Sequence, residues 1–90
     1  MIKSVSIIVR GKVQGVGFRY NAMKEAKELR LLGFVKNNYD GSVYIEATGE
    51  EDKIELFINW CYKGSKWAMV EDVNVSEIEK TVFNSFSVKQ

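Results

Sequence analysis

The segment of this chain most suited to chemistry is a glycine-rich stretch that ends at an arginine, residues 12–19. Gly15 and Gly17 allow consecutive backbone amides to turn inward and form a concave site for an anion. Arg19 adds a planar cationic group that suits phosphate. The stretch lies between a predicted strand and a predicted helix, whose N-terminus carries unpaired N–H groups and partial positive charge. The pattern predicts a phosphate or carboxylate site, although the same glycines could simply turn the chain and leave Arg19 solvated.

Asn37 is the second candidate, because it lies inside a predicted strand where asparagine is disfavoured. A polar residue that breaks a local structural rule points to function. A strand end that prepares a turn is the alternative explanation, and it suits the neighbouring Asn38 better. Successive side chains of a strand point to opposite faces, so only one of the two asparagines can face the glycine-rich stretch.

Composition excludes several kinds of chemistry. The chain has no histidine, which removes histidine-based triads and histidine metal ligands. Its one cysteine, Cys61, cannot form an intramolecular disulfide, and its place on an apolar stripe predicts core packing. The acidic run at residues 50–52 is typical of a helix N-terminus rather than of a metal site. We therefore expect neither a metal nor a cofactor.

Charge and hydropathy narrow the possible partners. Thirteen basic and twelve acidic residues leave a net charge of +1, without the basic excess of a nucleic-acid-binding protein. No stretch approaches the ~18 apolar residues of a membrane span, and no signal-peptide run opens the chain. We expect a monomer in the cytoplasm that contacts neither nucleic acid nor membrane.

The elements that must position these residues follow from hydrophobic periodicity. Val5, Ile7 and Val9 share one face of the first predicted strand. Alternation of apolar and polar residues predicts strands over residues 4–10, 34–38, 43–48 and 67–78, with a possible short edge strand at 86–88. Apolar residues three and four apart predict one helix over residues 19–32 and a second that ends near residue 64.

Short signals mark the boundaries of these elements. Gly33 occupies the position of a helix-ending glycine, and Gly64 closes the second helix. Thr48 and Glu51 have the spacing of a capping box, which would begin that helix. The dipeptide at residues 40–41, Asp-Gly, predicts a hairpin turn.

The resulting order, β-α-β-β-α-β, is that of the ferredoxin-like split β-α-β fold. We expect an α+β protein whose two helices cover one face of an antiparallel or mixed sheet. Ninety residues form one domain, residues 1–90, with no room for a second.

Two long motifs closely resemble the signatures of the acylphosphatase family. Residues 9–19 read VRGKVQGVGFR, against Val-x-Gly-x-Val-Gln-Gly-Val-x-Phe-Arg in the family. Residues 33–43 read GFVKNNYDGSV, against Gly-[Phe/Trp]-Val-x-Asn-x-x-Asp-Gly-x-Val. The resemblance extends over nearly the whole chain. One departure is Gly64-Ser65, where members commonly have Gly-Pro.

The resemblance implies a metal-independent hydrolase that cleaves acyl phosphates to carboxylate and inorganic phosphate. Arg19 would bind the phosphate and Asn37 would orient the attacking water. The amide cradle would be formed by Gln14, Gly15, Val16, Gly17, Phe18 and Arg19. Inorganic phosphate or sulfate would bind there as product or inhibitor.

A binding module on the same fold is the competing hypothesis. RNA-recognition domains stack bases on aromatic residues of the central strands, and the third strand here offers only Tyr44. A domain that binds anions without turnover would keep Arg19 and the glycines but would not need Asn37. The asparagine at the signature position favours catalysis.

Overall fold

A long first strand lies inside the sheet and is paired with a neighbouring strand on each side. The computed structural model describes residues 1–90. In chain order the elements are β1 (Ile2–Lys12), α1 (Phe18–Glu28), β2 (Leu32–Asn37), β3 (Val43–Glu50), α2 (Glu51–Lys63), β4 (Met69–Glu77) and β5 (Phe86–Val88).

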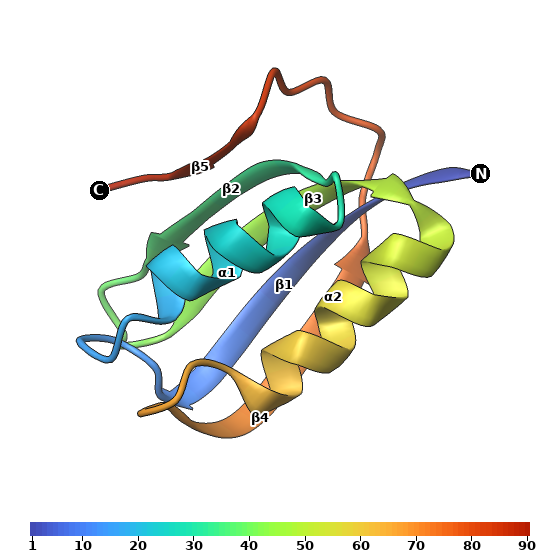
Figure 1. The fold of residues 1–90 in the computed structure, drawn as a ribbon. Coiled ribbons are helices and arrows are strands. Elements are labelled where there is room, and N and C mark those ends of the chain that lie inside the picture. The colour runs from blue at the N-terminus through green and yellow to red at the C-terminus, as the bar shows by residue number, and fades with distance from the viewer.

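The five strands form one mixed sheet in the order β4-β1-β3-β2-β5. The four longer strands pair antiparallel, whereas β5 runs parallel to β2 at the edge. Both helices cover the same face of the sheet (Figure 1). The predicted α+β ferredoxin-like fold is confirmed, including the short C-terminal edge strand.

The core lies between the helices and the sheet. The inward residues predicted for β1, namely Val5, Ile7 and Val9, are buried there. They contact buried residues of both helices, including Phe18 at the start of α1 and Cys61 in α2. Burial raises the pKa of the Cys61 thiol above its ordinary value, because the thiolate would lose its hydration. Cys61 is thus a core residue, as its place on the apolar stripe predicted.

The end of α1 differs from the prediction. The helix stops at Glu28, not at Leu32. Arg30 adopts a left-handed conformation with φ 59°, and the N–H groups of Arg30 and Leu31 donate back to carbonyls of the last turn. This is the Schellman arrangement, in which glycine usually occupies the left-handed position. An arginine there gives no such signal in the sequence.

Gly33 therefore does not end the helix, and it lies inside β2. Its φ is 146°, and a Cβ at this position would overlap the carbonyl oxygen of Glu46 on β3. The glycine is needed for close approach of two strand backbones rather than for a helix end.

The capping box was also predicted wrongly. Thr48 lies within β3, and its hydroxyl is hydrogen-bonded to Ser4 of β1 at 2.7 Å. The N-cap of α2 is Glu50, which makes no side-chain capping bond. Strand pairing extends two residues beyond Thr48, so the threonine is used across the sheet instead of at the helix. The end of α2 at Gly64 is confirmed.

Candidate active site

The loop between β1 and α1 carries the predicted anion site. Gly15 and Gly17 have φ of 73° and 76°, the left-handed region that other residues rarely adopt. Gly17 is the N-cap of α1, and no side chain caps the first turn of that helix. The N–H groups of this turn therefore remain available to a ligand, and the macrodipole favours an anion there.

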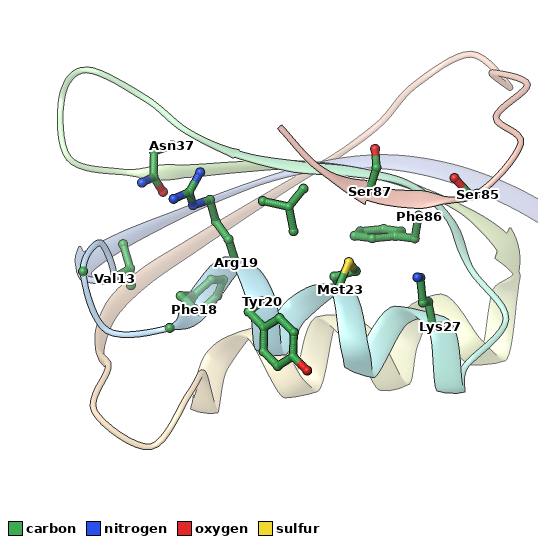
Figure 2. Close-up of a pocket in the computed structure, with 13 residues that line it drawn as sticks. Val13, Phe18, Arg19, Tyr20, Met23, Lys27, Asn37, Ser85, Phe86 and Ser87 are labelled. Atoms are coloured by element: carbon green, nitrogen blue, oxygen red, sulfur yellow. The ribbon is translucent and has the colours of Figure 1, made fainter. Parts of the chain in front are cut away.

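Arg19 lies in the first turn of α1 and is half-buried. Its Nη1 donates a hydrogen bond to the carbonyl oxygen of Lys89 near the chain end, at 3.0 Å. Figure 2 shows its guanidinium pointing from the helix towards the end of β2, where Asn37 is found. This contact holds a fixed positive charge beside the amides of the loop.

Asn37 is the last residue of β2 and pairs with Val43 of β3. It lines the same pocket as Gly15, Gly17 and Arg19. Its Oδ1 is buried and has no hydrogen-bond partner, the sole side-chain oxygen or nitrogen in the structure in that condition. A buried acceptor without a partner costs about 1–3 kcal/mol, so this oxygen is free to accept a hydrogen bond from a donor in the pocket.

Asn38 has a different environment. It lies beyond the end of β2, in the hairpin turn predicted from residues 40–41. Its Nδ2 donates to Ser42 Oγ at 3.0 Å, and it does not line the pocket. Asp40 accepts hydrogen bonds from the side chain and the backbone N–H of Ser42, which lower the pKa of its carboxyl group. These bonds stabilise the turn that follows Asn37.

Gln14 connects the amide loop to that turn. Its Nε2 donates to the carbonyl oxygens of Asn38, at 2.8 Å, and Ser42, at 2.9 Å. The glutamine side chain thus points into the protein rather than into the pocket. Of the six residues predicted for phosphate binding, Gly15, Gly17, Phe18 and Arg19 line the pocket, whereas Gln14 and Val16 do not.

A second side-chain hydrogen bond holds the loop between β1 and α1, and it comes from the end of α2. Ser65, which follows the end of α2, is buried and donates from Oγ to the carbonyl oxygen of Val16 at 2.9 Å. No role for Ser65 was predicted from the sequence. The one available signal was a serine where the family commonly has proline.

The pocket continues well beyond the loop. Its volume is about 710 Å³, and it extends between α1 and the C-terminal strand. Figure 2 shows Met23, Lys27 and Phe86 along this extension. These residues were not predicted from the sequence, although Arg19, Met23 and Lys27 have the four-residue spacing of one helix face. The contribution of β5 could not be read from local pattern, because it depends on pairing with β2.

No group of three or more acidic or cysteine side chains is arranged to hold a metal ion. No helix combines the length and the apolar character needed to cross a membrane.

Comparison with known proteins agrees with this fold. The acylphosphatase family profile matches residues 5–88. An acylphosphatase of Oceanobacillus iheyensis is 43% identical over 90 residues, covering 98% of this chain and 99% of its own. The crystal structure of an acylphosphatase from Bacillus subtilis superimposes with a TM-score of 0.94 at 40% identity, over the full length of both chains. An acylphosphatase structure from Coxiella burnetii gives 0.95 at 40% identity, covering 98% of this chain and 93% of that one.

The fold and these comparisons therefore define an α+β hydrolase of acyl phosphates. The chain belongs to the acylphosphatase family.

Proposed function

We propose that this acylphosphatase binds the phosphoryl group in the loop of residues 14–19 and directs a water held by Asn37 onto phosphorus. The new bond forms between the water oxygen and phosphorus, while the bond from phosphorus to the acyl oxygen breaks. The electron pair of that bond leaves with the carboxylate. The proton of the water passes to a phosphoryl oxygen of the substrate, and the products are carboxylate and inorganic phosphate.

Electrostatics supports the assignment of the loop and Arg19. Phosphoryl transfer spreads negative charge over the equatorial oxygens, so catalysis depends mainly on positioning and on charge stabilisation. Backbone N–H groups at the start of α1 and the guanidinium of Arg19 are already oriented and need no rearrangement during the reaction. The carboxylate is a good leaving group and needs no strong general acid. We therefore propose a reaction that requires no metal ion.

The observation that carries the proposal is the buried, unpartnered Oδ1 of Asn37 in the same pocket as Arg19. A water that donates to this oxygen would be held for attack on a phosphoryl group in the loop. A module that only binds anions would have no reason to keep an unsatisfied acceptor there. We further propose that the protein acts as a cytoplasmic monomer. We also propose that it does not bind nucleic acid, because a net charge of +1 lacks the basic excess typical of such proteins.

Acetyl phosphate hydrolysis by three alanine variants tests these roles, with excess chelator throughout. Arg19→Ala should lose both turnover and phosphate binding, since the guanidinium holds the phosphoryl oxygens in ground and transition states. Asn37→Ala should lose about a hundredfold or more in kcat. It should keep near-normal inhibition by phosphate, because the bound product does not need the water.

Asn38→Ala is the matched control. It keeps the backbone carbonyl that Gln14 contacts and should retain activity within a few-fold. Circular dichroism and thermal melting check folding for all three variants. If Asn38→Ala abolished activity while Asn37→Ala was nearly silent, the water would be assigned to the wrong asparagine. If wild-type activity disappeared in chelator and returned with a divalent ion, the metal-free mechanism would be wrong.

A further inference from the structure

The pocket is larger than its phosphate end requires. A volume of about 710 Å³ is in the range of sites that bury drug-sized ligands. The loop amides, Arg19 and Asn37 occupy one end (Figure 2). The proposed function uses only this end. The remaining space is continuous with it and offers room for the group attached to the phosphoryl group.

The middle of the pocket is apolar. The side chains of Met23 on α1 and Phe86 on β5 lie between the two elements, and Val88 also contributes to the lining. Phe86 is buried, with its ring packed edge-on against Phe57 of the core. A chain of methylene groups would replace water along this surface, which favours binding in proportion to the apolar area covered.

The far end is cationic. Lys27 lines the pocket two turns along α1 from Arg19, at an axial distance of about 12 Å. Figure 2 shows its ammonium directed from α1 towards the C-terminal strand. It takes part in none of the three ion pairs of the structure. The pocket therefore has one cation at each end, an apolar middle and no acidic side chain in its lining.

We infer that this enzyme prefers acyl phosphates whose acyl chain is about six carbons long and ends in a second carboxylate. The phosphoryl group would lie in the loop, the methylenes between Met23 and Phe86, and the distal carboxylate at Lys27. When extended, such a chain is shorter than the axial distance of about 12 Å between Arg19 and Lys27, and the long lysine side chain covers the difference. The inference rests on the proposed function, since it takes the loop as the phosphoryl site.

Three substrates separate the contributions of the chain and the charge: acetyl phosphate, hexanoyl phosphate and adipoyl monophosphate. KM should fall several-fold from acetyl to hexanoyl phosphate, because the chain enters the apolar middle. At low ionic strength, KM should be about three- to fivefold lower for adipoyl phosphate than for hexanoyl phosphate. This is the effect expected of one solvent-accessible ion pair. This last gain should disappear in 0.5 M salt.

Lys27→Gln should bring the KM ratio of hexanoyl to adipoyl phosphate close to one. Lys24→Gln is the matched control, because Lys24 is exposed on the same helix and does not line the pocket. It should keep the wild-type ratio. Equal KM for hexanoyl and adipoyl phosphate in the wild type, or equal loss of the ratio in both variants, would overturn the inference. Failure of the wild type to hydrolyse acetyl phosphate would instead reject the proposed function itself.

Discussion

At the scale of single residues, side chains that do not face the pocket set the position of those that do. Gln14 is the clearest example, since one amide group contacts two carbonyl oxygens of the hairpin turn. These bonds connect the loop that would hold the phosphate with the strand end that carries Asn37. The relative position of Arg19 and Asn37 thus depends on a side chain that reaches neither.

Gln14→Ala should therefore weaken both folding and catalysis. Each carbonyl that loses Gln14 keeps one backbone partner within the turn, so the loss in the free energy of unfolding should be about 1–2 kcal/mol. Phosphate affinity and kcat should also fall, because loop and turn are no longer held together. Urea unfolding and acetyl phosphate kinetics measure the two effects. A stable variant with normal kinetics would show that the two hydrogen bonds do not fix the site.

The roles of some single residues could be predicted from the sequence, whereas those of others could not. Arg19, Asn37 and the loop glycines could be selected because their types are unusual at their positions. The direction of the Gln14 side chain could not, because glutamine suits a loop whether it faces a ligand or the protein. Its role depends on a turn that lies more than twenty residues away in the chain.

At the scale of elements, the end of α2 supports the start of α1. A trans peptide bond holds its C=O and N–H groups in opposite directions in one plane. Ser65 donates to the carbonyl oxygen of Val16, so it also fixes the direction of the Gly17 N–H in the same peptide unit. Donation to the carbonyl further polarises the unit and makes that N–H a better donor.

Ser65→Ala should reduce phosphate affinity and kcat/KM together, because the Gly17 amide would no longer be held in one orientation. The lost bond and the partly buried carbonyl left behind should cost about 1–3 kcal/mol of unfolding free energy. Phosphate titration and steady-state kinetics provide the test. Ser76→Ala, at an exposed position of β4, is the control and should match the wild type. Unchanged phosphate affinity in Ser65→Ala would contradict a positioning role for the hydroxyl.

Elements were predictable where one local signal acted alone. Period two gave β1 and its buried face, and the apolar spacing gave both helices. The wrong boundaries occurred where tertiary contacts prevailed: Arg30 takes the left-handed position at the end of α1, and Thr48 bonds across the sheet. Gly33 looked like a helix end because a glycine for close strand approach has the same sequence signal as a capping glycine.

At the scale of the whole molecule, the pocket is assembled from segments distant in the sequence. The loop and α1 provide one wall, the end of β2 provides Asn37, and the C-terminal strand closes the other side. The parallel pairing of β5 with β2 brings the chain end to the site, where the carbonyl of Lys89 accepts a hydrogen bond from Arg19. Ligand binding and global stability should be coupled, because the site exists only when all of these segments are folded.

Inorganic phosphate should therefore raise the melting temperature of the wild type. A ligand that binds only the folded state stabilises it by about 2.7 kcal/mol at one hundred times its Kd. For a chain of this size the shift is roughly 10–20 °C. Calorimetry with phosphate, against sodium chloride at equal ionic strength, separates specific binding from a general salt effect. Asn37→Ala should keep the shift, since the water ligand does not hold the product, whereas Arg19→Ala should lose most of it. A shift of the same size in phosphate and in chloride, or one that survives in Arg19→Ala, would place the anion elsewhere than in the loop of residues 14–19.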